Sequence, residues 1–244
     1  MKRLFRTLSI IGVGAALVLS LATSARADEL KILTTGILKG SITRIATQFE
    51  KESGHKVSMS WGPSSGNSRE ASPVRVRSGH FAALDRRDVA ISKIGVAVKA
   101  GRPLPDISTP SALRQALLDA KSIAYSEGAS GTYVANVLLK KLGVQEQVAG
   151  KSHVILGRQF VAEVVASGEV ELGIQQLSEL RLDPGVAVVG PLPEELQKVS
   201  VVSAAVSSKA REVGAAKQFL AFLATPFATS AIKASGLDLP TSNL

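Results

Sequence analysis

Short apolar segments alternate with segments of helical periodicity along most of this chain of 244 residues. Such an alternation is typical of α/β proteins, in which helices cover a sheet of strands. Hydrophobic residues make up 45% of the sequence and aromatic residues only 4%, so the core is expected to be aliphatic. The sequence therefore predicts an α/β fold of one or two domains.

The clearest helical pattern places apolar side chains on one face from Leu38 to Phe49 and ends near Gly54. Residues 69–93 show no clear strand, and residues 184–198 contain several prolines and are interpreted as a connection. The other expected helices are 110–118, 132–142, 159–167 and 213–223, and the expected strands are 30–33, 56–61, 94–98, 122–125, 154–156, 171–175 and 199–206.

The N-terminus has the pattern of an export signal. A basic start precedes an uncharged apolar stretch from Leu8 to Ala22, and Ala25-Arg26-Ala27 has the small-x-small pattern that signal peptidase accepts. A membrane anchor is the alternative, but the apolar stretch is shorter than a spanning helix, which needs about 20 apolar residues. Residues 1–27 are therefore predicted to be the cleaved signal peptide of a periplasmic protein.

The charge of the chain favours a small anionic ligand. The formal net charge is +9, of which four basic residues belong to the expected signal peptide. The other Lys and Arg residues are scattered, whereas a nucleic-acid partner would require a basic stripe. A modest positive field suits a small anion. The absence of cysteine excludes a disulfide framework and thiolate metal sites.

Three loops rich in hydroxylated residues and glycine follow expected strands: Thr34-Thr35-Gly36, Ser64-Ser65-Gly66 and Ser130-Gly131-Thr132. In open α/β sheets, ligands lie beyond the carboxyl ends of strands, where helix N-termini offer unpaired N–H groups to an anion. Small residues allow the ligand to approach these donors. Each loop alone could serve only as a helix cap. Three such loops in one chain favour an anion-binding site.

Other polar residues lie near the expected strand ends. Arg158 precedes an expected helix, and it is either a ligand contact or an ordinary surface charge. Gln175 and Gln176 end a strand, where their amides offer both donors and acceptors. Glu127 and Glu179 are candidates for a general base, and a surface or capping role is the alternative.

Recognisable catalytic and cofactor motifs are missing from the sequence. It contains no nucleophile elbow and no phosphate loop. Its three histidines, His55, His80 and His153, do not have metal-ligand spacing. No catalytic residue, cofactor or metal site is therefore predicted.

Several segments together resemble the periplasmic molybdate-binding proteins and related solute receptors of ABC importers. The segments are IATQFEKESGHKV at 45–57, SSG at 64–66, ASGTY at 129–133, KKLG at 140–143 and ELGIQQLSEL at 171–180. This resemblance implies a two-lobed periplasmic binding protein fold of type II. The ligand is then expected in a cleft between the lobes, which close by a hinge.

The resemblance also implies how the chain is divided. The first lobe is expected to contain residues 28–95 and 204–244, and the second lobe residues 96–203. Two strands, at 94–98 and 199–206, are expected to cross between the lobes.

The same resemblance assigns ligand contacts in the first lobe. Ile37 occupies the position of a serine of the family and offers only its backbone N–H, so Thr34 or Thr35 is expected to supply the hydroxyl. Ser64 matches the family's second serine, and the neighbouring Ser65 belongs to the same loop.

In the second lobe the resemblance places backbone donors at Ser130 and Arg158, and Gln176 replaces a tyrosine that contacts molybdate. With the small residues of the three loops, the expected ligand-binding residues are Thr34, Thr35, Gly36, Ile37, Ser64, Ser65, Ser130, Gly131, Thr132, Arg158 and Gln176.

Arg158 leaves two kinds of anion open. The family holds a compact oxyanion through uncharged donors, whereas a guanidinium group matches a carboxylate. The ligand is therefore either a molybdate-like oxyanion or a small organic acid. The expected function is that of a receptor that presents its closed form to an ABC permease in the inner membrane.

An enzyme on the same scaffold is the alternative, because aconitate isomerase is similar to these receptors. A cleft that binds a tricarboxylate through Arg158, with Glu127 or Glu179 nearby, could move a proton next to a carboxylate.

Overall fold

The structure is a computed structural model that describes residues 29–62 and 86–241. The expected signal peptide at 1–27 and the serine-rich loop with Ser64 and Ser65 lie outside the described residues. No helix within the described ranges has both the length and the apolar character that crossing a membrane requires.

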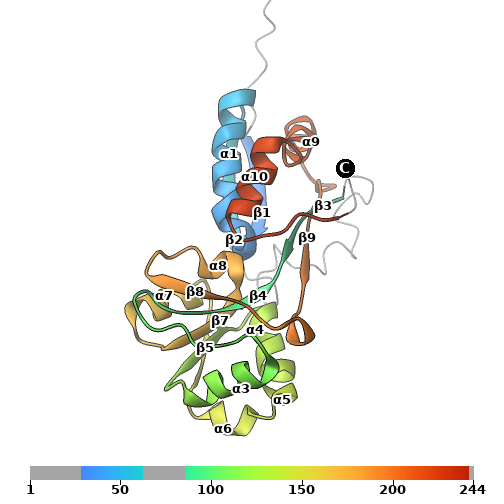
Figure 1. The fold of residues 1–244 in the computed structure, drawn as a ribbon. Helices are drawn as coiled ribbons and strands as arrows, with labels where there is room; N and C mark the ends of the chain where they lie inside the picture. Colours follow the sequence, from blue (N-terminus) through green and yellow to red (C-terminus); the bar gives the residue numbers. More distant parts are fainter. Residues whose placement is uncertain (1–28, 63–85, 242–244) are drawn as a thin grey trace, which may run out of the picture.

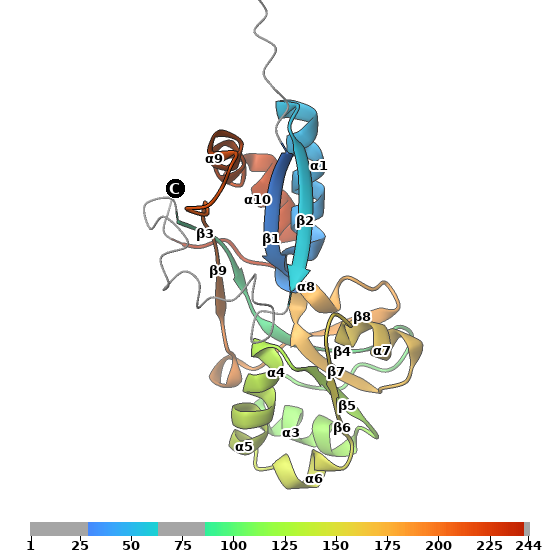
Figure 2. The same cartoon turned by 180° about the vertical axis from the view of Figure 1, so that it is seen from behind.

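The first lobe contains two parallel strands covered by helices (Figure 1). Its elements are β1 (Glu29–Thr35), the 3-10 turn η1 (Gly36–Leu38), α1 (Lys39–Ser53), β2 (Lys56–Gly62), α9 (Val213–Phe222) and α10 (Pro226–Ala234). The view from behind in Figure 2 shows β1 and β2 in front of α1 and α10. The covering helices therefore come from both ends of the chain.

The core of the first lobe joins these helices to the strands. Ile45 and Phe49 of α1 are buried in one apolar cluster with Phe219 of α9 and Ile232 of α10. The rings of Phe49 and Phe219 meet edge to face, with centroids 5.1 Å apart. The predicted end of this helix is confirmed, because Gly54 caps α1 with a φ of 75°, a value that glycine adopts without strain.

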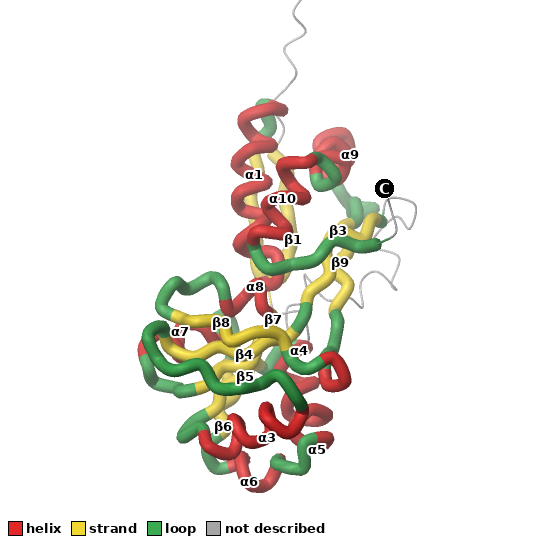
Figure 3. Tube along the Cα trace, in the orientation of Figure 1, coloured by secondary structure: helices red, strands yellow, loops and turns green. Residues whose placement is uncertain are grey.

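The second lobe contains a five-stranded mixed sheet in the order β6-β5-β7-β4-β8. β5 is parallel to β6 and β7, whereas β4 is antiparallel to β7 and β8. The strands are β4 (Ile94–Lys99), β5 (Ile123–Ser126), β6 (Ser152–Ile155), β7 (Leu172–Gln176) and β8 (Val186–Pro191). Figure 3 shows them in yellow among the helices of this lobe.

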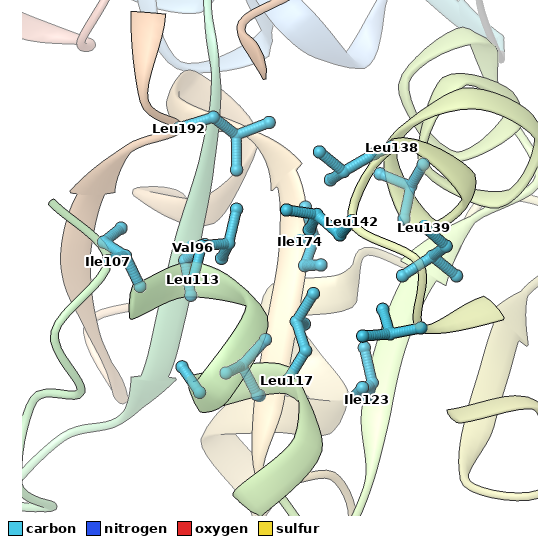
Figure 4. Packing of buried hydrophobic residues seen from close by; sticks show 14 of the residues in the cluster. Val96, Ile107, Leu113, Leu117, Ile123, Leu138, Leu139, Leu142, Ile174 and Leu192 are labelled. Atoms are coloured by element: carbon cyan, nitrogen blue, oxygen red, sulfur yellow. The ribbon is translucent and has the colours of Figure 1, made fainter. Parts of the chain in front are cut away.

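Helices cover both faces of this sheet. The helices are α3 (Pro110–Asp119), α4 (Ala129–Tyr133), which continues through a π-helical turn (Val134–Leu138) into α5 (Leu139–Lys141), and then α6 (Gln145–Ala149), α7 (Val161–Ser167) and α8 (Leu177–Leu180). In the larger core, Leu113 and Leu117 of α3 share an apolar cluster with Ile123, Leu138 and Ile174 (Figure 4). Fully buried aliphatic side chains of this size each contribute about 2 kcal/mol of stability.

A separate antiparallel pair, β3 (Arg87–Ser92) and β9 (Ser200–Ala204), runs between the two lobes (Figure 1). The sequence predicted that the strands at 94–98 and 199–206 cross between the lobes. The position of β9 agrees with this prediction for 199–206, but the prediction for 94–98 is wrong. Those residues form β4, which is buried because it lies between β7 and β8. The strand that pairs with β9 comes from the stretch 69–93, where charged residues obscure the apolar alternation. The lobe boundaries themselves stay predictions.

Strand β8 and helix α10 are among the elements that the sequence does not predict. β8 lies within residues 184–198, which were interpreted as a connection because of their prolines. Pro184 precedes the strand, Pro193 follows it and Pro191 is its last residue, and β8 is an edge strand, where proline is tolerated. Helix α10 begins at Pro226 after Thr225, whose hydroxyl accepts a hydrogen bond from the Ala228 N–H at 3.3 Å.

The small residues at the start of α4 have a steric reason. A Cβ on Gly131 would overlap with the carbonyl oxygen of Ser126 at the end of β5. The helix begins directly against the strand it follows, and only glycine allows this approach. The Ser-Gly sequence thus holds the backbone N–H groups of this turn close to the strand end.

Gly131→Ala is expected to lower the free energy of unfolding by roughly 2–3 kcal/mol, because the overlap with Ser126 outweighs the higher helix propensity of alanine. Urea denaturation measures this difference. Gly150→Ala is the matched control, because a Cβ there meets no atom within 4 Å, and its unfolding free energy should change by less than about 0.5 kcal/mol. Equal denaturation midpoints for both variants would contradict the steric explanation.

Candidate functional site

A cavity of about 130 Å³ lies between the two lobes. Gly36, Lys39 and Trp61 line it from the first lobe. The second lobe contributes the end of β5, the start of α4, the loop at 155–160, Gln175 and Glu179. The cavity is therefore where strand ends and helix starts of the two lobes meet, the position at which α/β proteins bind ligands.

Of the first-lobe residues predicted to bind the ligand, Gly36 lines the cavity. Thr34 is buried, and Ile37 is buried in the apolar cluster of this lobe, so neither side chain lines the cavity. The Thr35 hydroxyl next to Gly36 is buried and has no hydrogen-bond partner among the described residues. A buried unpaired hydroxyl costs free energy, which a ligand would recover by bonding to it.

In the second lobe, Ser130 is buried and lines the cavity. Gly131 does not line it and packs against the backbone of Ser126. Thr132 is exposed outside the cavity, and its hydroxyl lies 3.5 Å from the carbonyl oxygen of Glu127. The cavity side of this turn is thus presented by Ser126, Gly128 and Ser130.

Arg158 lines the cavity from an exposed loop that is fixed at both ends. The Gly157 N–H donates to the Glu127 carboxylate at 2.7 Å, and the Val161 N–H donates to the Gln175 side chain at 3.1 Å. These two hydrogen bonds hold the loop against β5 and β7. Glu127 is therefore engaged in positioning the loop.

Gln175, rather than Gln176, lines the cavity. Gln176 is buried on the opposite side of β7, where its amide accepts from the Ser92 hydroxyl at 2.6 Å and donates to the Ser200 hydroxyl at 3.4 Å. It thereby links the second lobe to the β3–β9 pair. Alternate residues of a strand face opposite ways, so a shift by one position separates the two amides.

The cavity residues that the sequence prediction did not name include Lys39, Trp61 and Phe160. The ammonium group of Lys39 lies 4.8 Å from the ring centroid of Phe160, so a cation–π contact joins the two lobes. The position of Lys39, shortly after the loop Thr34-Thr35-Gly36, could have indicated in the sequence that it lies at the site. Trp61 and Phe160 resemble core residues in sequence, because aromatic side chains are usually buried.

Glu179 is the most strongly perturbed acidic group at the cavity. Burial raises the pKa of its carboxyl group to about 7, and a hydrogen bond from the Gln175 side chain partly opposes this rise. Gly36 faces it so closely that a Cβ there would overlap with Oε1 of Glu179. At neutral pH this carboxyl group is therefore partly protonated and can donate as well as accept a hydrogen bond.

The charges around the cavity suit an anion. Lys39 and Arg158 supply two cations from different lobes, while Glu179 is partly neutral and Glu127 is bonded to the loop backbone. Within residues 29–62 and 86–241, no group of three or more His, Asp or Glu residues could hold a metal ion.

Two α/β lobes joined by a strand pair, with a cavity between them that includes cationic and hydrogen-bonding side chains, define a two-lobed binding protein. The chain belongs to the bacterial extracellular solute-binding protein family, whose sequence model matches residues 68–238. This assignment confirms the family resemblance and the α/β two-lobed fold that the sequence predicts.

Two curated proteins are similar over nearly the whole chain. The aconitate isomerase of a Pseudomonas species is 35% identical over 256 residues, which cover 96% of this chain and 97% of that protein. The molybdate-binding protein ModA of Azotobacter vinelandii is 28% identical over 254 residues, which cover 94% and 96%.

Solved structures share the fold. The periplasmic molybdate-binding protein of Azotobacter vinelandii has a TM-score of 0.67 at 24% identity and covers 87% of this chain and 100% of its own. Peb3 from Campylobacter jejuni has a TM-score of 0.63 at 15% identity, with 86% and 100% covered.

Glu179→Gln is expected to raise the free energy of unfolding above neutral pH. The unfolded chain releases the Glu179 proton near pH 4.5, whereas the folded protein keeps it until about pH 7. Between these values the folded state binds more protons, so this group makes the protein less stable as pH rises. The advantage of the variant over wild type should grow by up to about 3 kcal/mol between about pH 4 and about pH 8.

Urea denaturation across this pH range measures the advantage. Glu169→Gln is the matched control, because Glu169 is exposed and does not line the cavity, and the stability of this variant should depend on pH as that of wild type does. A constant difference between Glu179→Gln and wild type at all pH values would contradict the raised pKa.

Proposed function

We propose that this protein is a periplasmic receptor of an ABC importer and that it binds a small organic acid with two or three carboxylates. The observation that carries the proposal is the cavity between the lobes, which both lobes line with cationic and hydrogen-bonding groups, among them Lys39 and Arg158. An anion held by both lobes would favour their closed arrangement, which is the form a permease recognises.

A carboxylate ligand accounts for more of this cavity than a compact tetrahedral oxyanion does. The guanidinium group of Arg158 can bind a carboxylate through two parallel hydrogen bonds. Protonated Glu179 is a donor that a second carboxylate can accept from. Trp61 and Phe160 offer apolar surface for the carbon chain of an organic acid, which molybdate lacks.

Two contacts between the lobes at this cavity fit the proposal. Lys39 of the first lobe lies over the ring of Phe160, and Gly36 lies against Glu179 of the second lobe. All four residues line the cavity. A ligand in the cavity between the lobes is shielded from water, which strengthens its charge-assisted hydrogen bonds. The export signal expected at residues 1–27 and the family assignment support a periplasmic location.

Arg158→Gln is expected to weaken binding of a tricarboxylate by at least about tenfold, because charge-assisted hydrogen bonds are lost. Isothermal titration calorimetry with cis-aconitate, trans-aconitate, citrate, molybdate and sulfate measures this effect. Arg102→Gln is the control: Arg102 is exposed, pairs with Glu171 at 3.5 Å and does not line the cavity. Tightest binding of molybdate, unchanged by Arg158→Gln, would refute the organic-acid ligand.

A second candidate function is isomerisation of aconitate, and the carboxyl group of Glu179 is the observation that favours it. Interconversion of cis- and trans-aconitate requires a base that removes a proton from the methylene carbon and returns it to another carbon of the same allylic system. A group with a pKa of about 7 can both accept and return a proton at neutral pH. The 35% identical relative is an aconitate isomerase.

If the enzyme hypothesis holds, Glu179→Gln should lower turnover by at least about a hundredfold while aconitate still binds. Proton NMR in D₂O detects both the interconversion and the incorporation of deuterium. Glu169→Gln should keep the wild-type rate. Tight binding of aconitate by wild type without any interconversion would exclude this candidate and leave the receptor.

A further inference from the structure

A second cavity, of about 170 Å³, lies between the lobes on the other side of α8. Gly40 and Arg44 of α1, together with the end of α10, line it from the first lobe, and Ser178, Arg181 and Leu182 line it from the second. None of these residues lines the first cavity. Figure 1 shows α8 beneath α1 and α10, where the two lobes approach each other.

The lining of this cavity has only positive charge. Arg44 and Arg181 belong to different lobes, and no Asp or Glu side chain lines the cavity. Neither arginine takes part in a salt bridge with another described residue. When the lobes approach, two guanidinium groups are brought to one cavity without a counter-charge, and like charges repel each other.

A hydroxyl group at the same place also has no partner. Ser178 is only 3% exposed, and its Oγ makes no hydrogen bond with the part of the chain that the structure describes. Leaving a buried hydroxyl unpaired is unfavourable, so such groups are usually satisfied by a protein group, water or ligand. The hydroxyl of Ser235, which also lines the cavity, donates to the Ile232 carbonyl at 2.7 Å and remains able to accept.

We propose that this second cavity binds a doubly charged oxyanion of the phosphate or sulfate type, which bridges Arg44 and Arg181 and accepts a hydrogen bond from Ser178. Guanidinium groups match such oxyanions through paired N–H donors. Without the anion, the guanidinium groups of Arg44 and Arg181 repel each other. With the anion bound, both groups are attracted to its negative charge. It therefore stabilises the closed arrangement from a site separate from the first cavity.

The consequence for ligand binding follows from thermodynamic linkage. An anion that binds better to the closed form shifts the lobes toward closure, and any ligand of the first cavity that also prefers the closed form then binds more tightly. The two sites are coupled through α8, since Glu179 faces the first cavity and its neighbours Ser178 and Arg181 face the second.

Titration calorimetry with sodium sulfate, at an ionic strength kept constant with sodium chloride, tests the proposal. Wild type should bind sulfate, and Arg44→Gln and Arg181→Gln should each weaken this binding by at least about tenfold, because each removes a charge-assisted contact. Both arginines are exposed, so the variants should keep the fold, which circular dichroism verifies. Ser178→Ala should weaken binding less, by several-fold.

Variants of the first cavity separate the two sites. Sulfate binding that survives Lys39→Gln and Arg158→Gln but is lost in Arg44→Gln and Arg181→Gln supports the second site. Three results overturn it: no sulfate binding in the millimolar range, loss only with the first-cavity variants, or dependence on a single arginine, which would exclude a bridge between the lobes. None of these results depends on which organic acid, if any, the first cavity binds.

Discussion

The contact between the start of α1 and helix α8 is the constraint on which both cavities depend. Gly36 lies against Glu179 and Phe160, and a Cβ on Gly40 would lie 3.4 Å from the Leu182 side chain. The close approach requires glycine at position 36, where any Cβ would overlap with Glu179 and Phe160, whereas a Cβ on Gly40 would make an ordinary van der Waals contact. The approach divides the space between the lobes, so one cavity remains on each side of α8.

Helix α8 has only four residues, yet it and the residue that follows it contribute polar or charged side chains to both cavities. Ser178 and Arg181 present a hydroxyl and a guanidinium group to one side, and Glu179 presents a carboxyl group to the other. Because the helix follows β7 directly, its position is set by a buried central strand rather than by a surface loop. The fold thus holds the acidic group of the first cavity and the basic group of the second within three consecutive residues, Glu179 to Arg181.

The sequence predicted the features that depend on local pattern. The end of α1 at Gly54, and the start of α3 after Thr109, whose hydroxyl accepts from the Ala112 N–H at 3.1 Å, follow from capping rules. Gly36, Ser130 and Arg158 do line the first cavity, since residues after strand ends gather at one edge of a sheet. Whether they contact the ligand stays a prediction.

What the sequence did not predict depends on register and on contacts between distant segments. Gln175 and Gln176 are chemically identical, and only the pairing of β7 decides which amide faces the cavity. Trp61 and Phe160 belong to different lobes and meet the same cavity only because the lobes approach each other. Arg44 and Arg181 likewise line one cavity only in the folded chain, since they are 137 positions apart in the sequence.

The protonation state of Glu179 distinguishes the two functions proposed for the first cavity. A bound polycarboxylate places negative charge beside this group, which raises its pKa further and favours the neutral donor form. Lys39 and Arg158 line the same cavity and can neutralise part of the charge of such a ligand. A ligand whose charge exceeds theirs is held by a protonated Glu179, as in a receptor. A ligand whose carboxylates are neutralised by the two cations leaves the pKa of Glu179 near 7, so part of the population keeps the ionised form that a proton-abstracting base requires.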